Sequence, residues 1–179
     1  MEVYLIRHTK PLLTSGLIYG HLEVPLADSF SVEWPEIIPQ LPPALDRIYS
    51  SPSLRCFRLA ELLSNEFNAP CIPDERLREL HFGDWEGQTW DSVDQADLKL
   101  WMDDFVNERV PGGESMLDLQ NRVMRFWEGL QHEADGRIAI VTHAGVIRLL
   151  LAMHRQVALE DSFSIKVEYG EVVRGSLRC

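Results

Sequence analysis

Two arginines and two histidines stand just past buried apolar runs of the chain, where they could act together on a ligand. Arg7 and His8 directly follow four apolar residues near the start of the chain. Arg55 comes shortly after a second run, and His143 comes shortly after a third. Each position alone is typical of a solvated strand end. Because the carboxyl ends of parallel strands share one edge of a sheet, the three positions together predict a site.

The residue types at these positions suit a phosphoryl group. Arginine is a fixed cation with a planar donor fork that matches phosphate oxygens. The charge of Arg7 favours the neutral form of His8, and a neutral imidazole could attack phosphorus and form a phosphohistidine. Glu79 is the leading candidate for the acid that protonates the leaving oxygen and then activates water. Arg7, Arg55 and His143 would supply the donors that a transferring phosphoryl group requires.

Strands and helices alternate along the chain, with hydrophobic patterns that switch between the two periods. Apolar runs predict strands at residues 3–6, 45–50, 70–73 and 138–141. Helical periodicity predicts helices in the thirties, shortened by two prolines, and over 52–67, 91–107, 116–130 and 146–153. In the tail, Phe163–Glu168 and Glu171–Val173 are predicted to pair as strands around a turn at Gly170. Tight loops are expected over 77–87, and a long one over 9–30.

Two helix starts have capping signals. Ser51 followed by Pro52 is typical of an N-cap residue and the first helical position. Ser115 with Asp118 three residues later resembles a capping box. The alternation of strands and helices predicts a three-layer α/β/α sandwich with a largely parallel central sheet. Its 179 residues suit one domain, taken as 1–179.

Composition excludes several classes of function. The formal net charge of −11 disfavours nucleic acid as the main partner, because binding the phosphate backbone requires a basic face. No apolar run approaches the length of a membrane span, and no signal peptide is apparent. The cysteines Cys56, Cys71 and Cys179 have no paired spacing, which favours a reducing compartment and a cytoplasmic location. Oligomeric state is open at this point.

Several segments, in the same order along the chain, resemble motifs of the histidine phosphatase superfamily, which has the phosphoglycerate-mutase-like fold. The segments are Leu5–Thr9, Ser50–Arg55, Leu77–Leu80 with Phe82–Gly87, Pro111–Ser115 and Thr142–Gly145. The resemblance implies a phosphate monoester hydrolase that needs no metal or cofactor. It implies His8 as the nucleophile, Glu79 as the acid and base, and Arg7, Arg55 and His143 as phosphate ligands. Glu86 is the rival acid.

Within the superfamily, the segments Thr9–Pro11 and Tyr19–Phe30 resemble the α-ribazole-5′-phosphate phosphatase branch, whose members act in cobalamin biosynthesis. No second basic cluster is apparent, so the rest of the substrate is expected to be neutral and apolar. Apolar residues of the loop 12–27 could pack against such a group or belong to the core. The roles of Lys10 and His21 are open.

Three other functions compete with this hypothesis. A phosphoglycerate mutase, a bisphosphatase or a broad-specificity small-molecule phosphatase would share the same fold. A non-catalytic phosphate-binding module is a different class, disfavoured because the nucleophile, the acid and the cations are all present. A metal site formed by His8, His143 and Glu79 is disfavoured because the sequence lacks paired histidine spacing.

Overall fold

A computed structural model describes residues 1–131 and 136–175. Its central sheet has five strands in the order β3-β2-β4-β1-β5. The strands are β1 (Glu2–Arg7), β2 (Arg47–Ser50), β3 (Cys71–Pro73), β4 (Arg137–Thr142) and β5 (Val172–Gly175). β4 is parallel to both β1 and β2, β2 is parallel to β3, and β5 runs antiparallel to β1 at the edge. The predicted, largely parallel sheet is therefore confirmed.

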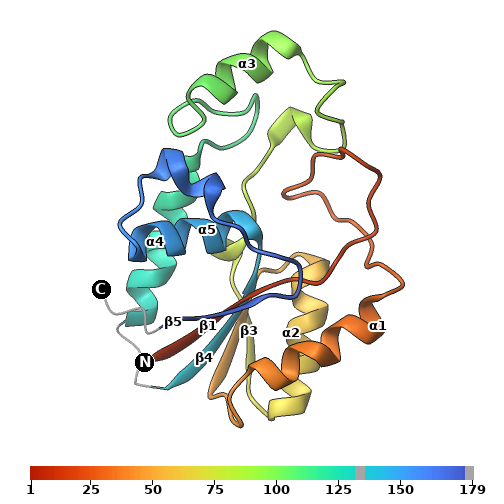
Figure 1. Ribbon diagram of the computed structural model, residues 1–179, viewed down its shortest axis with the longest axis vertical. Helices are drawn as coiled ribbons and strands as arrows, with labels where there is room; N and C mark the ends of the chain where they lie inside the picture. Colours follow the sequence, from red (N-terminus) through yellow and green to blue (C-terminus); the bar gives the residue numbers. More distant parts are fainter. Residues whose placement is uncertain (132–135, 176–179) are drawn as a thin grey trace.

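Helices cover both faces of the sheet and make the three predicted layers. They are α1 (Phe30–Glu33), α2 (Leu54–Phe67), α3 (Gln95–Asp103), α4 (Met116–Gln131) and α5 (Ala144–His154). Figure 1 shows α4 and α5 on one side of the sheet and α1 and α2 on the other, while α3 stands away from the sheet at one end of the molecule. The helix of the thirties is short, as expected, and continues as a 3-10 helix over Trp34–Gln40.

The alternation of side chains in the strands explains why both faces are covered. In β4, Ile138 and Ile140 belong to the core under α4 and α5, whereas Ala139 and Val141 belong to the core under α2. Successive side chains of a strand point to opposite faces, so a continuous apolar run requires helices on both. The run that predicted this strand is thus buried on each side.

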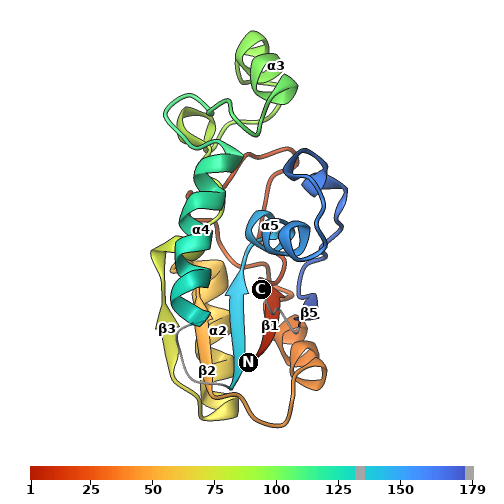
Figure 2. The same cartoon turned by 90° about the vertical axis from the view of Figure 1, so that its left-hand side faces the viewer.

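The carboxyl ends of the parallel strands point toward the end of the molecule that carries α3. In Figure 2 the arrow of β4 points in that direction. β1 and β4 pair with Arg7 opposite Thr142, and β2 pairs with β4 with Ser50 opposite Val141. The residues that follow these three strands therefore lie side by side, as the sequence predicted.

Two predicted helix boundaries are wrong. α2 begins at Leu54 with Ser53 as its N-cap residue, so Ser51 is not the N-cap and Pro52 is not the first helical residue. The reason is that the Ser51 N–H still donates to the Val141 carbonyl and extends the sheet. The helix predicted over 91–107 covers Gln95–Asp103, because the Asp94 side chain accepts from the N–H groups of Ala96 and Asp97 and fixes its start.

The capping box before α4 is confirmed. The Asp118 N–H donates to Ser115 Oγ over 3.2 Å, and the Ser115 N–H donates to Asp118 Oδ2 over 3.0 Å. These two bonds satisfy backbone donors that a helix start would otherwise leave free. α4 thereby begins directly after the turn of Gly112 and Gly113.

The predicted strand pair of the tail is wrong in its first half. Leu159–Ser164 form a 3-10 helix, and β5 pairs with β1 instead of with residues 163–168. The Ile165 carbonyl accepts from Arg148 Nε and the Val167 carbonyl from Arg7 Nη1. Arginine side chains thus satisfy carbonyls that a strand would have used in a ladder.

Cys56 is buried and Cys71 is half-buried, and both are free thiols; Cys179 lies outside the described residues. Cytoplasmic location stays a prediction from cysteine usage. Among the helices in residues 1–131 and 136–175, none combines the length and apolar character required to cross a bilayer.

Candidate active site

The register of the sheet places the two site histidines next to each other. β1 and β4 end with Arg7 opposite Thr142, and the His8 N–H donates to the Thr142 carbonyl over 3.0 Å. The ring centroids of His8 and His143 are 5.3 Å apart, at an interplanar angle of 67°. Residues 135 positions apart in sequence thus form one pair of imidazoles at the strand ends.

His8 is held as a neutral imidazole. Its side chain is 2% exposed, and burial, then the charges of Arg55 and Arg7, lower its pKa to about 3, against the opposing hydrogen bond to Thr9. Nδ1 lies 2.7 Å from the Thr9 carbonyl oxygen, which can only accept, so Nδ1 carries the proton. Nε2 then keeps its lone pair, as a nucleophile requires.

His143 is the N-cap residue of α5 and is fully buried. Its Nε2 lies 2.8 Å from Ser51 Oγ and 3.5 Å from Cys56 Sγ. Burial, followed by the charges of Arg55 and His8, holds the pKa of His143 well below its usual value. The Ser51 hydroxyl, predicted to cap α2, instead contacts this imidazole.

Arg7 and Arg55 are each anchored at one end and covered by an aromatic ring. Arg55 donates to the Gly20 carbonyl from Nη2 over 2.7 Å, and Arg7 donates to the Val167 carbonyl from Nη1 over 2.6 Å. The Arg7 Cζ lies 3.7 Å from the ring centroid of Tyr169. Tyr169 is not among the predicted site residues, because it lies beside the turn predicted at Gly170.

Three buried polar atoms around His8 have no hydrogen-bond partner in the described structure. They are Arg7 Nε, Arg55 Nε and Thr9 Oγ1. A buried polar group without a partner costs about 1–3 kcal/mol, so such atoms require an explanation. Two unpaired cationic donors and a hydroxyl beside a neutral imidazole suit a ligand with several acceptor oxygens.

Hydrogen bonds hold both the carboxylate and the backbone carbonyl of Glu79. Its carboxylate accepts from the Leu80 N–H and from the Gly145 N–H, each over 3.0 Å. Its carbonyl accepts from Arg122 Nη2 over 2.6 Å and from His21 Nε2 over 2.9 Å. The first turn of α5 thus holds the carboxylate of Glu79.

Glu86, the rival acid, has a different environment. Its carboxylate accepts four backbone N–H bonds, from residues 20, 21, 22 and 82. Burial raises the pKa of Glu86, but these four hydrogen bonds outweigh burial, so its pKa lies below the ordinary value. A carboxylate held ionised in this way fixes the loop 20–22 and is a poor proton donor.

A cleft of about 200 Å³ joins these groups. His8, Glu79 and His143 line it together with Arg7, while Arg55 is fully buried behind it. The loop residues Leu17, Ile18 and Tyr19 line the cleft, whereas Leu12 is exposed and borders a separate groove with Lys10. The apolar loop is therefore divided between the cleft, the core and the surface.

Arg148 also lines the cleft, although it is not among the predicted site residues. Its Nε donates to the Ile165 carbonyl over 2.9 Å, which leaves its terminal nitrogens for other partners. The sequence predicts no second basic cluster, and Arg148 adds a single further cation to the cleft. The available signal was position, because Arg148 is one helical turn beyond Ala144 and interrupts an otherwise apolar helix.

The grouping of His, Cys, Asp and Glu side chains in the described residues gives no support for the metal-site alternative. Within the part of the chain that the structure describes, no group of three or more His, Cys, Asp or Glu side chains could hold a metal ion. The arrangement can instead bind an oxyanion with cationic and hydroxyl donors, offer a neutral imidazole nitrogen, and present a carboxyl group to a leaving oxygen.

Comparison with known proteins agrees with this chemistry. The family model described as "Histidine phosphatase superfamily (branch 1)" matches residues 3–177. A protein of Hydrogenobacter thermophilus named "Putative phosphoserine phosphatase 2" is 29% identical, covering 93% of this chain and 85% of its own. The adenosylcobalamin/alpha-ribazole phosphatase of Salmonella typhimurium is 28% identical, over 95% of this chain and 87% of the relative. The crystal structure of the alpha-ribazole phosphatase of Shigella flexneri superimposes with a TM-score of 0.86 at 26% identity, over 97% of this chain and 89% of that one.

Proposed function

This chain belongs to the histidine phosphatase superfamily (branch 1), and on that premise we propose that it hydrolyses small phosphate monoesters through a phosphohistidine at His8. The whole chain, 1–179, would act as one domain. The observation that carries the proposal is the set of unpaired buried atoms Arg7 Nε, Arg55 Nε and Thr9 Oγ1 around a neutral imidazole. A phosphoryl group would satisfy these atoms with its oxygens.

The proposed reaction has two steps. In the first, His8 Nε2 attacks phosphorus, a P–N bond forms, the P–O bond to the alcohol breaks, and protonated Glu79 gives its proton to the leaving oxygen. In the second, the Glu79 carboxylate takes a proton from water, the water oxygen attacks phosphorus, and the P–N bond breaks. Inorganic phosphate is released and His8 returns to its neutral form.

Arg7, Arg55 and His143 would hold the phosphoryl oxygens throughout. Guanidinium groups stabilise the charge of the transferring group because they are already oriented before the reaction. Since these side chains supply the charge, we propose that no metal is needed. Activity on 4-nitrophenyl phosphate should survive exhaustive treatment with EDTA; loss of activity on chelation that a divalent metal restores would contradict this part.

For the substrate, we propose α-ribazole 5′-phosphate or the corresponding cobamide phosphate. Support comes from the motifs Thr9–Pro11 and Tyr19–Phe30 and from the similarity to two alpha-ribazole phosphatases. The second candidate is a substrate with an additional carboxylate, such as phosphoserine or 3-phosphoglycerate. Arg148 favours it, because its guanidinium lines the same cleft as His8.

Steady-state kinetics on these three compounds tests the choice. We expect kcat/KM for α-ribazole 5′-phosphate to exceed the other two by at least about tenfold, which is ~1.4 kcal/mol in transition-state binding. An advantage of the same size for phosphoserine or 3-phosphoglycerate would favour the second candidate. Arg148→Gln separates them further, since it should then impair the carboxylate-bearing substrate selectively.

A further inference from the structure

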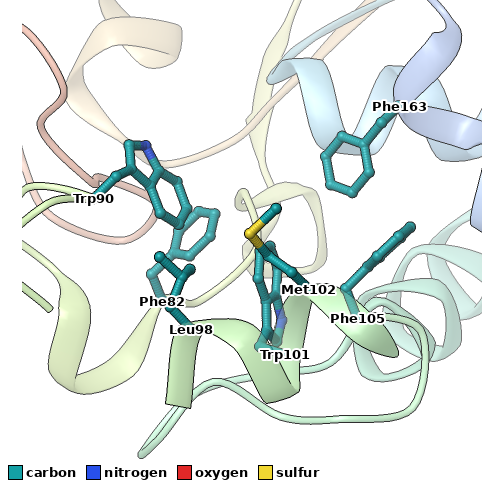
Figure 3. Close-up of a pocket in the computed structure, with 7 residues that line it drawn as sticks. All are labelled: Phe82, Trp90, Leu98, Trp101, Met102, Phe105 and Phe163. Carbon is teal, nitrogen blue, oxygen red and sulfur yellow. The ribbon is translucent and has the colours of Figure 1, made fainter. Parts of the chain in front are cut away.

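A second, larger cavity of about 520 Å³ opens beside the catalytic cleft. All of its lining side chains are apolar, and Figure 3 shows them facing a common space from several segments. We call this cavity the aromatic pocket; its lining residues are Phe82, Trp90, Leu98, Trp101, Met102, Phe105 and Phe163. Helix α3, which stands away from the sheet, contributes three of them.

Ring-to-ring contacts fix the shape of the aromatic pocket. Trp101 is buried and stacks on Trp90, with centroids 6.1 Å apart and an interplanar angle of 21°. On the other side, Phe105 meets Phe163 edge-on at 4.8 Å. Phe163 and Met102 remain exposed at the rim, at 46% and 63%. The pocket is therefore shaped by packed rings and presents aromatic side chains to solvent, which is typical of a binding site.

The aromatic pocket adjoins the catalytic cleft. Phe82, Trp90 and Phe163 line both cavities. A phosphate placed against His8 would therefore extend its alcohol portion past these rings and toward α3. Because the pocket walls have no charged side chain, the group that enters must be uncharged. Aromatic walls favour a planar ring over an alkyl chain, because ring-to-ring contacts add to the burial of apolar area.

We propose that the aromatic pocket binds an uncharged, planar aromatic group on the alcohol portion of the phosphate monoester. This inference rests on the proposed phosphatase function and names the substrate class that the site selects. Selection comes from Trp90 and Phe163, which stand between the phosphate and the pocket and would contact the ring as it enters.

The test compares two substrates with the same kind of leaving group, 2-(1-naphthyl)ethyl phosphate and ethyl phosphate. Both release a primary alkoxide, so a difference in kcat/KM reports contacts with the ring and not the chemistry of the bond. We expect the naphthyl compound to be preferred at least about tenfold, as an apolar group gains in a fitting pocket. Equal kcat/KM values in the native protein would overturn the proposal.

Helix α3 offers a matched pair of variants. Met102→Glu places a carboxylate at the rim of the pocket, and Leu100→Glu makes the same charge change two residues away, outside the pocket lining. The two side chains are almost equally exposed, at 63% and 64%, so folding and net charge are affected alike. We expect Met102→Glu to lose the naphthyl preference and Leu100→Glu to keep it, with turnover of ethyl phosphate unaffected in Leu100→Glu. The same loss in both variants would contradict the proposal.

Calorimetry separates failure of this inference from failure of the phosphatase proposal. 3-(1-Naphthyl)propylphosphonate and propylphosphonate have a C–P bond that is not hydrolysed, so their binding does not depend on turnover. Tighter binding of the naphthyl compound, weakened by Met102→Glu and not by Leu100→Glu, would support the pocket even if no ester were hydrolysed. Equal binding of both phosphonates would overturn it.

Discussion

Gly145→Ala should impair catalysis far more than folding. Gly145 is in the first turn of α5, and its N–H donates to Glu79 Oε2 over 3.0 Å. A Cβ atom at this position would lie 2.1 Å from Glu79 Oε1, so the carboxylate must move by more than ~1 Å to reach ordinary contact distance. The atom that must move is the end of a flexible side chain, which can turn away without disturbing the backbone.

The expected magnitudes follow from this geometry. Losing a hydrogen bond to a charged group costs roughly 1.5–3 kcal/mol, and alanine in a helix returns about 0.5–1 kcal/mol relative to glycine. Net destabilisation is therefore roughly 0.5–2.5 kcal/mol, and the protein should stay folded. A displacement of ~1 Å in a catalytic group costs on the order of 10²-fold in rate. We expect that loss for an alkyl phosphate, whose leaving oxygen needs a proton.

The assay measures kcat/KM for ethyl phosphate and 4-nitrophenyl phosphate, with urea unfolding alongside. 4-Nitrophenolate leaves without protonation, so its rate should fall much less. Gly129→Ala is the matched control, because a Cβ at Gly129 in α4 would lie 3.9 Å from Arg76 Nη1, an ordinary contact distance. It should leave both rates unchanged. Unimpaired turnover of ethyl phosphate by Gly145→Ala would refute the role of Glu79, and equal losses on both substrates would assign Glu79 to positioning alone.

Two further predictions concern protonation. Glu86→Gln should lower the free energy of unfolding at pH 7, because an amide cannot accept the same four N–H bonds. The expected loss is about 2 kcal/mol and not more, because solvent reaches part of the site and screens the charge. Since folding lowers the pKa of Glu86, its contribution to stability is full above its ordinary pKa of 4.5 and is lost as the pH falls through the lowered pKa of the folded state. Urea unfolding at several pH values should therefore show that the stability of the variant falls less steeply in acid than that of the native protein. The pKa of His8, lowered to about 3, predicts no protonation of the nucleophile between pH 5 and 8. A profile of kcat/KM for 4-nitrophenyl phosphate, corrected for ionisation of the substrate, should show no limb from His8 in that range. A limb near pH 6.5 that coincides with the titration of the His8 imidazole in NMR spectra would contradict it.

The parts of the structure that local pattern determines could be predicted from the sequence. The buried strands β1 and β4 appear as continuous apolar runs, and their parallel pairing follows from the helices between them. The strand ends then bring His8 and His143 to one edge, which confirms the predicted convergence. These features depend on residues close in sequence and on one general rule of sheet topology.

The parts that depend on distant partners could not be predicted. Ser51 has the local pattern of an N-cap, but His143 takes its hydroxyl. The alternation of Phe163, Ile165 and Val167 is typical of a strand. In the structure, however, arginine side chains donate to the Ile165 and Val167 carbonyls, which a strand would have paired with a neighbouring strand. Local pattern does not show which distant donor will reach a carbonyl.

The covalent intermediate at His8 tests the central claim most directly. The native protein, mixed with ³²P-labelled substrate and quenched within the first turnover, should carry label that is stable in base and labile in acid, as a phosphoramidate is. Peptide mapping should place the label on His8, and His8→Ala should neither be labelled nor turn over. Near-normal turnover by His8→Ala, or label on another residue, would contradict the account.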